Sequence, residues 1–268
     1  MIIDFHVHID ESEEPKAYLV QTKKGREAIL ASMEESCIDL SVLLVIAQKN
    51  DLDATRMQND WLAGVCKQTP RFEGFGSVHP EDGNDALAEM KRCVEELGLK
   101  GLKLHPDVQA FDCAHPGLVE IYKQAADLDI PVIIDALTIN DSQQPAKLLN
   151  AYMASPQTKV CLAHVGGWRF MDFGIFGMIA KYTAFDLNVY FDLSTSINWF
   201  YGTQFQGQFC EVTSFIGADK LLFGSDLPAF SQKDALNATM DFGYPEDWLP
   251  KILGGNAARF LKIDGRDQ

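Results

Sequence analysis

Short apolar runs rich in β-branched and aromatic residues recur along the chain at a nearly constant interval. Each run is followed by a longer stretch that looks helical. The runs are mostly continuous rather than alternating, which is typical of parallel strands buried on both faces. We expect eight strands, at Ile2–His6, Leu40–Ile46, Phe72–Val78, Gly101–Leu104, Pro131–Ala136, Lys159–His164, Val189–Ser194 and Leu221–Ser225.

The stretches between the runs are predicted to be helices, because apolar residues recur in them three and four positions apart. These helices are expected at Lys24–Ser36, Ala54–Gln68, Asp82–Leu97, Pro116–Asp127, Gln143–Ala154 and Gln232–Met240. The segment Gly166–Leu187 is rich in aromatic residues. Such a composition favours a folded lid or a contact between subunits over a loose loop.

Eight strand–helix units of about 30 residues each occupy nearly all of the 268 residues. They predict an α/β fold, a single (β/α)8 TIM barrel that forms one domain over residues 1–268. A doubly wound open sheet is the alternative. That fold calls for a glycine-rich turn after the first strand, and the sequence there is Asp4-Phe5-His6-Val7-His8.

The composition of the chain disfavours several classes of binding partner. With 23 Lys+Arg against 38 Asp+Glu, the formal net charge is −15, which disfavours binding to nucleic acid. We expect no membrane partner, because no apolar run approaches the roughly 20 residues of a spanning helix. The first residues lack the pattern of a secretory signal, and the six cysteines are scattered, so we expect reduced thiols and a cytoplasmic protein. We therefore expect a small-molecule substrate, and the sequence does not decide whether the chain forms a homo-oligomer.

Histidines gather at the predicted strand ends. Four of the six histidines, His6, His8, His105 and His164, follow or end a strand. Two carboxylates, Asp135 and Asp226, do the same. Since catalytic groups of a TIM barrel stand at the C-terminal ends of its strands, we expect these side chains to share one site.

The first strand end carries a candidate metal site. His6 and His8 are two residues apart, so both side chains project to the same side of the strand. Asp226 reaches the same region from the eighth strand, which neighbours the first in a closed barrel. A metal ion held by two imidazoles and a carboxylate, with one coordination position open, lowers the pKa of the water bound there. The alternative is that the two histidines only hydrogen-bond to each other.

Taken together, the motifs resemble a known family. The chain is similar to the metal-dependent amidohydrolases, in the branch that includes aminocarboxymuconate semialdehyde decarboxylase, aromatic-acid decarboxylases and the pyrone dicarboxylate lactonase. The resemblance covers essentially the whole chain in the family's order. It rests on Asp4-Phe5-His6-Val7-His8, Gly101-Leu102-Lys103-Leu104-His105-Pro106, Pro131-Val132-Ile133-Ile134, Ala163-His164-Val165-Gly166-Gly167, Leu222-Phe223-Gly224-Ser225-Asp226-Leu227-Pro228 and Gly255-Asn256-Ala257-Ala258-Arg259-Phe260.

The resemblance implies roles for individual residues. His6 and His8 correspond to the first-strand metal ligands. Asp226 corresponds to the eighth-strand ligand that also handles a proton, and His164 to the histidine that activates water or polarises the substrate. On strand five the family typically has a histidine ligand, whereas this chain has Asp135.

With a carboxylate on strand five, three arrangements of the metal site are possible. Asp135 ligates the metal, His164 takes the place of Asp135 as the third ligand, or the metal site is weak or empty. We expect one divalent metal, zinc with manganese as the alternative, held by His6, His8, Asp135 and Asp226. Some members of the branch that the chain resembles act without a metal. An empty metal site would therefore not imply an inactive protein.

Three residues are candidates for substrate binding. Lys103 is interpreted as a cation for a substrate carboxylate, as a carboxylated bridging ligand like that of two-metal relatives, or as a buried lysine paired with Asp4 or Asp135. His105 is expected to hydrogen-bond the substrate. Arg169 is expected either to clamp a carboxylate in a bidentate fork or to lie on the surface against aromatic neighbours.

The leading functional prediction is a metal-dependent hydrolase of a small, carboxylated amide, ester or lactone, with His164 and Asp226 as catalytic residues. The first alternative is non-oxidative decarboxylation of an aromatic or muconate-type acid at the same site. The second is a barrel that only binds a metabolite because its metal site is impaired.

Overall fold

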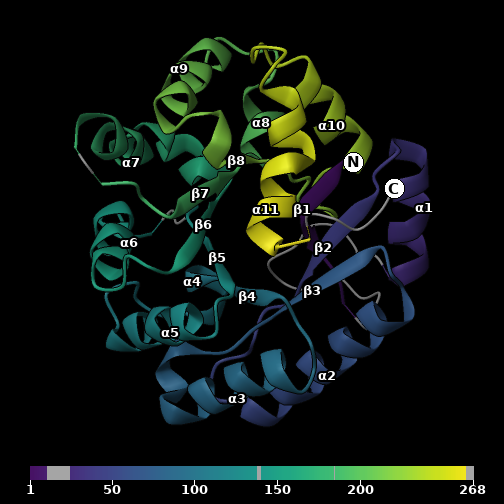
Figure 1. Cartoon of the computed structure of the whole chain (residues 1–268), viewed down its shortest axis with the longest axis vertical. Helices are drawn as coiled ribbons and strands as arrows, with labels where there is room; N and C mark the ends of the chain where they lie inside the picture. The colour runs from purple at the N-terminus through teal and green to yellow at the C-terminus, as the bar shows by residue number, and fades with distance from the viewer. Residues whose placement is uncertain (11–24, 138–139, 184, 264–268) are drawn as a thin grey trace.

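The computed structural model describes residues 1–10, 25–137, 140–183 and 185–263. Eight parallel strands follow one another in chain order around a barrel, and the helices form a ring outside it (Figure 1). The TIM-barrel prediction is therefore confirmed. The strands are β1 (Ile3–His8), β2 (Leu40–Leu44), β3 (Phe72–Gly76), β4 (Gly101–Leu104), β5 (Pro131–Asp135), β6 (Lys159–Ala163), β7 (Val189–Asp192) and β8 (Leu221–Leu222).

The helices include every one predicted, with ends shifted by at most two residues, and several short ones inserted after the strands. They are α1 (Arg26–Ser36), α2 (Leu52–Gln68), α3 (Asn84–Glu95), α4 (Pro106–Gln109), α5 (Pro116–Asp127), α6 (Gln144–Met153), α7 (Phe170–Tyr182), α8 (Ser196–Phe200), α9 (Gln206–Ile216), α10 (Gln232–Met240) and α11 (Asn256–Leu261). Short turns of helix complete the list: η1 (Pro80–Asp82), η2 (His164–Arg169), η3 (Ala218–Lys220) and η4 (Lys251–Gly255). Among the described residues, no helix has the length and apolarity needed to cross a bilayer.

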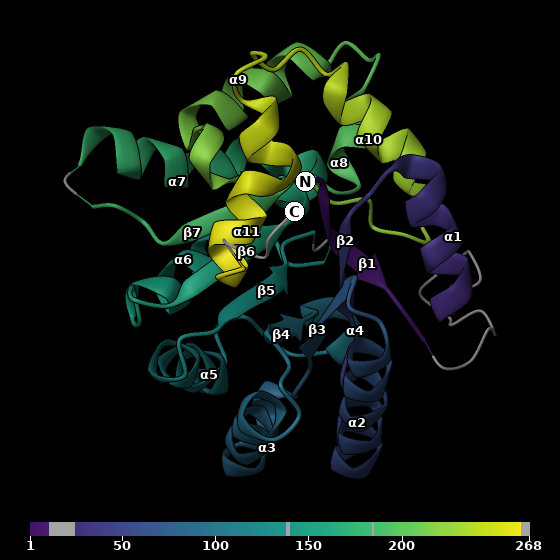
Figure 2. The same ribbon diagram turned by 45° about the vertical axis from the view of Figure 1, so that its right-hand side comes forward.

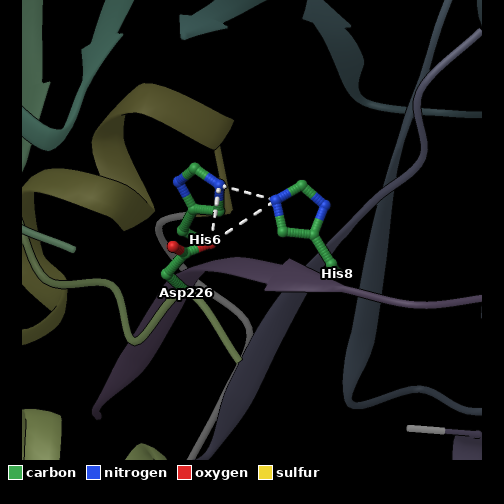
Figure 3. A group of neighbouring side chains, drawn as sticks. All are labelled: His6, His8 and Asp226. Atoms are coloured by element: carbon green, nitrogen blue, oxygen red, sulfur yellow. Dashed lines mark hydrogen bonds and ion pairs between the residues drawn. The ribbon is translucent and has the colours of Figure 1, made fainter. Parts of the chain in front are cut away.

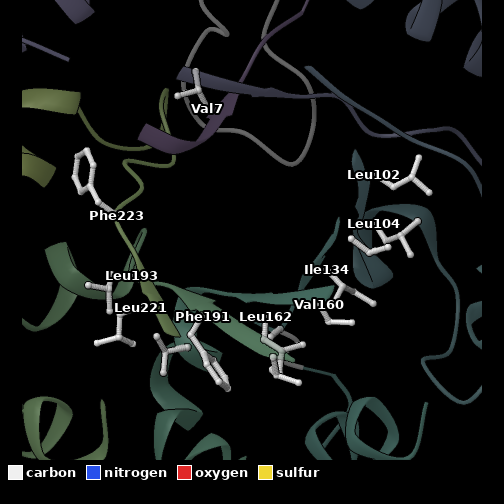
Figure 4. Close-up of a cluster of buried hydrophobic side chains, with 14 of the residues drawn as sticks. Val7, Leu102, Leu104, Ile134, Val160, Leu162, Phe191, Leu193, Leu221 and Phe223 are labelled. Carbon is white, nitrogen blue, oxygen red and sulfur yellow. The ribbon is translucent and has the colours of Figure 1, made fainter. Parts of the chain in front are cut away.

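Alternate strand residues build two apolar layers, as the two-residue period of a strand requires. Side chains such as Leu104, Ile134 and Phe191 point away from the barrel axis into the layer beneath the helices (Figure 4). Their neighbours Ile133 and Leu222 belong to a second cluster that also includes residues of α11. This packing leaves the C-terminal ends of the strands to carry polar groups.

The barrel closes where β1 meets β8, and few backbone hydrogen bonds hold this seam. Phe5 donates its N–H to the carbonyl of Phe223 over 2.9 Å, and Asp226 donates its N–H to the carbonyl of His6 over 2.8 Å. Because β8 is only two residues long, side chains must contribute to the closure.

Asp4 supplies that contribution from a fully buried position. Its carboxylate accepts hydrogen bonds from the Ser225 N–H (2.8 Å), the Ser225 hydroxyl (2.6 Å), the Gln232 amide (2.8 Å) and the His6 N–H (3.2 Å). Burial raises the pKa of Asp4 to about 6, although these hydrogen bonds oppose the rise. Asp4 thus ties β1 to the segment after β8 and to α10.

An irregularity in β1 sets the direction of the His6 and His8 side chains. The pairing of β1 with β2 shifts between Asp4 and Val7, so β1 has one more residue than its partner in this interval. Phe5 packs in the second cluster, which includes residues of α11, whereas Val7 packs in the layer beneath the surrounding helices. A β-bulge between them accounts for this break in the side-chain alternation. As a result both His6 and His8 face the inside of the barrel.

We predict that Asp4→Ala lowers the free energy of unfolding by about 3 kcal/mol, because it removes the acceptor of four buried donors. Chemical denaturation monitored by circular dichroism measures the change. Asp53→Ala is the matched control, since the Asp53 side chain is 94% exposed, and it should change stability by no more than about 0.5 kcal/mol. Equal effects of the two substitutions would show that the seam does not depend on Asp4.

Candidate active site

A pocket of about 460 Å³ opens at the C-terminal ends of the strands. Its lining comes from several strand ends and from the loops and short helices that follow them. The polar residues are His8, His105, Asp107, Asp135, His164, Thr195 and Asp226, and the apolar ones are Ile46, Val108, Leu137, Trp199, Ala229 and Phe230. The mixture suits a small molecule with one apolar face and a few polar groups.

At one side of the pocket three predicted metal ligands converge (Figure 3). The Nε2 atoms of His6 and His8 are 3.1 Å apart. Asp226 Oδ1 is 3.6 Å from His6 Nε2 and 3.5 Å from His8 Nε2. Ligand atoms about 2.1 Å from one ion, at the angles of tetrahedral or octahedral coordination, lie roughly 3.0–3.4 Å apart. The three side chains therefore fit a divalent cation.

The ring of His6 is held in the tautomer that a metal needs. Its Nδ1 lies 3.1 Å from Asp192 Oδ2 at the end of β7. The surrounding hydrogen bonds and the nearby His6 hold the pKa of Asp192 below its ordinary value despite burial, so the carboxylate only accepts and Nδ1 carries the proton. Burial and the Lys103 ammonium lower the pKa of His6. The ring is thus neutral with Nε2 unprotonated, and this atom lies beside His8, Asp226 and the Lys103 ammonium.

Lys103 lies behind this group rather than in the pocket. The residue is fully buried, and its Nζ lies 3.3 Å from His6 Nε2. Among the described residues no ion pair joins it to Asp4 or Asp135, so that predicted pairing is not formed. Its ammonium places a positive charge beside the imidazole and does not line the substrate cavity.

Asp135 pairs with histidines instead of joining the three-residue group. Its Oδ2 lies 3.0 Å from His164 Nε2 and 3.6 Å from His105 Nε2. Burial opposes ionisation, but these two imidazoles hold the pKa of Asp135 well below its ordinary value. Burial would likewise lower the pKa of His164, but Asp135 outweighs it and raises the pKa to about 9. The structure therefore forms a buried imidazolium–carboxylate pair on the pocket wall.

Three of the site residues have left-handed backbone conformations that side chains rarely adopt. The φ angles are 63° at His164, 60° at Thr195 and 61° at Asp226, and such strain gathers at functional sites. The close packing also needs Gly224, because a Cβ there would lie 2.9 Å from the Cβ of His6 and 3.1 Å from that of Ser194.

Arg169 is turned away from the pocket. Its guanidinium donates to the carbonyls of Asp141 (2.8 Å) and Ser142 (2.6 Å) and to the carboxylate of Asp172. It is not among the pocket-lining residues. Of the three predicted substrate-binding residues, only His105 lines the cavity, where burial lowers its pKa.

The sequence reading missed three polar residues at the end of β7. Asp192 orients His6, Ser194 contributes its carbonyl to His164 Nδ1 (3.1 Å), and the Thr195 hydroxyl donates to Asp226 Oδ2 (2.5 Å). The signal was available, because these residues follow the seventh apolar run just as the predicted site residues follow theirs.

The eight-stranded barrel, with two histidines and a carboxylate converging at its strand ends, has the architecture of a TIM-barrel enzyme. The model of the amidohydrolase family matches residues 3–263. The chain therefore belongs to the amidohydrolase family, as the sequence motifs predicted, and it is an enzyme of that family.

Its relatives have narrower names. A 2-amino-3-carboxymuconate-6-semialdehyde decarboxylase of Dictyostelium discoideum is 25% identical over 251 residues, which cover 80% of this chain and 67% of the relative. A gamma-resorcylate decarboxylase of Rhizobium radiobacter is 26% identical over 268 residues, covering 82% and 79%.

A solved structure with the same fold is dihydroxybenzoic acid decarboxylase from Polaromonas sp. JS666, with bound manganese and the inhibitor 2-nitroresorcinol. It superposes with a TM-score of 0.74 at 18% identity, covering 98% of this chain and 97% of that one. At this identity the likeness shows the fold alone.

These comparisons contradict the predicted hydrolase activity. The muconate semialdehyde and gamma-resorcylate relatives, which each align with about four fifths of the chain, are decarboxylases rather than hydrolases. The hydrolase prediction is wrong because it assumed that the metal activates water, whereas a bound metal can also orient a substrate without any attack by water.

We predict that Arg169→Ala leaves KM for a carboxylate substrate unchanged within about twofold, since its guanidinium is engaged outside the pocket. The same substitution should lower the free energy of unfolding by about 1 kcal/mol through its lost hydrogen bonds. Steady-state kinetics and chemical denaturation measure the two effects. A rise of KM by tenfold or more with unchanged stability would mean that Arg169 reaches the substrate.

Proposed function

We propose that this enzyme is a metal-dependent decarboxylase of a small aromatic or muconate-type carboxylic acid. The observation that carries the proposal is the convergence of His6, His8 and Asp226 beside a pocket that is also lined by the hydrogen-bonded pair of His164 and Asp135. The names of the relatives support the same reaction class.

The site offers separate places for the two ends of such a substrate. A bound divalent cation, held by His6, His8 and Asp226, would supply positive charge for the carboxylate and neighbouring oxygen atoms. The ring would lie between the apolar side chains of Trp199 and Phe230, which line the pocket.

Decarboxylation replaces the carbon–carboxylate bond with a carbon–hydrogen bond, so the site must provide one proton as carbon dioxide leaves. The pair of His164 and Asp135 holds a proton between His164 Nε2 and Asp135 Oδ2, 3.0 Å apart, and both residues line the pocket. We assign proton delivery to this pair. Asp226 keeps its orientation through the hydrogen bond from Thr195.

The metal is proposed to be manganese or zinc, since two imidazoles and one carboxylate are ligands that both ions accept. Manganese is bound in the structure with the same fold. The predicted ligand Asp135 is assigned to proton delivery, because its Oδ2 already lies close to two histidines. We expect the enzyme to act in the cytoplasm, where its cysteines stay reduced.

The reaction class is tested with a panel of acids that includes 2,6-dihydroxybenzoate, incubated with Mn²⁺ or Zn²⁺. We predict metal-dependent release of carbon dioxide with the ring left intact. Carbon dioxide detection and NMR of the product measure the two outcomes. His164→Ala should lower kcat by about 10²- to 10⁴-fold, the usual contribution of a positioned acid. Release of acid from lactones or imides, without decarboxylation of any panel member, would contradict the proposal.

The ligand assignment is tested by metal content after loading with Mn²⁺ and desalting. We predict about one ion per chain in the wild type, loss of the ion in His8→Ala, and retention of it in Asp135→Asn, because only His8 belongs to the converging group. Elemental analysis by mass spectrometry measures the content. The reverse pattern would place Asp135 in the coordination sphere and remove it from proton delivery.

A further inference from the structure

The exposed side of α7 and its two flanks carry large apolar side chains, none of which lines the pocket. This set, here called the α7 face, comprises Trp168, Met171, Ile175, Met178, Tyr182 and Phe185, which are 41% to 68% exposed. Figure 2 shows α7 standing out at the edge of the molecule, with α9 as its neighbour. Solvent-exposed residues of this kind usually occur singly.

The spacing of the α7 face is that of a helix-pairing seam. Successive members are three, four, three, four and three residues apart. Alternating steps of three and four are the a/d pattern by which one helix packs along another. The helical pattern holds for Met171, Ile175, Met178 and Tyr182, which lie on α7. Trp168 and Phe185 flank the helix: Trp168 lies in η2 with its ring against Trp199 and Phe200, and Phe185 follows the extended Thr183.

The opposite side of α7 is already packed. Phe173, Gly174 and Gly177 are buried there, and a Cβ on Gly177 would lie 2.5 Å from the carbonyl carbon of Phe215 in α9. α7 is therefore apolar on both sides. A helix that is apolar all round is expected to be covered on both sides.

The area of the face matches what one subunit contributes to a dimer. With roughly 200 Å² for each fully exposed large side chain, the six exposed fractions correspond to roughly 700 Å². The largest apolar patch on a typical monomer is about 300–600 Å², and each partner of a standard interface buries about 800 Å².

We propose that the α7 face docks against the α7 face of a second copy of this chain, as an antiparallel helix pair about a two-fold axis. A self-complementary patch of this kind closes into a dimer and leaves no apolar row exposed. Methionine side chains suit such packing because they adapt to an opposing surface. The proposal concerns assembly and does not depend on the reaction catalysed.

The test compares the solution mass of three proteins by sedimentation at micromolar concentration. The wild type should have twice the chain mass of 29.8 kDa, and Met171→Glu/Met178→Glu should have the mass of one chain with an unchanged circular dichroism spectrum. The matched control is Met57→Glu/Met240→Glu, which alters methionines that are 72% and 50% exposed on α2 and α10; it should stay dimeric.

A second variant tests the geometry. Ile175 lies near the middle of the face, so a two-fold axis brings it close to its own copy. Ile175→Cys should form a disulfide-linked dimer on mild oxidation in much greater yield than Met57→Cys or the wild type, whose exposed Cys37 gives the background.

Three results would overturn the proposal. One is a wild type of single-chain mass, another is a Met171→Glu/Met178→Glu protein that remains dimeric, and the third is Ile175→Cys cross-linking no better than the controls. Single-chain mass together with co-sedimentation with phosphatidylglycerol vesicles, lost in the double glutamate variant, would assign the face to a lipid surface instead.

Discussion

Closure of the barrel between β1 and β8 is the constraint on which the site depends. His6 and His8 come from the first strand and Asp226 from the last, so the three side chains meet only when the two ends of the sheet join. The joining relies on a few backbone hydrogen bonds and on the buried carboxylate of Asp4. The bulge in β1 then turns both histidines inward. Fold stability and site geometry are therefore linked through one seam.

Buried charges at the site are arranged in pairs with distinct effects. Asp192 fixes the proton of His6 on Nδ1 and leaves Nε2 able to bind a cation. Asp135 does the opposite for His164, since its charge keeps that imidazole protonated. Under the proposed function, one carboxylate thus prepares a ligand and the other prepares an acid. Asp135 then forms a proton-holding pair with His164 at the end of β5, where the resemblance to the family led us to expect a metal ligand.

Much of the fold could be predicted because most strands coincide with short, largely apolar runs. The strand Gly101–Leu104 and the helices Pro116–Asp127 and Gln232–Met240 agree with the sequence reading residue for residue. The convergence of His6, His8 and Asp226 followed from the rule that strand ends share one rim. The boundary of β8 was less predictable, because its segment leaves the sheet after two residues.

Other parts of the site depend on contacts across the barrel that no local pattern reveals. Nothing in the sequence near Arg169 shows that its guanidinium binds two carbonyls instead of facing the pocket. The pairing of Asp135 with His164 requires the register of β5 against β6. The role of Asp192 likewise needs β7 to lie where its carboxylate reaches the ring of His6.

Anomalous diffraction from crystals grown with Mn²⁺ tests the central claim most directly. The account predicts one strong anomalous peak per chain, bonded to His6 Nε2, His8 Nε2 and an oxygen of Asp226, with Asp135 still hydrogen-bonded to His164. A peak coordinated by Asp135 in place of this group, or no peak at the group when manganese is bound elsewhere, would contradict it.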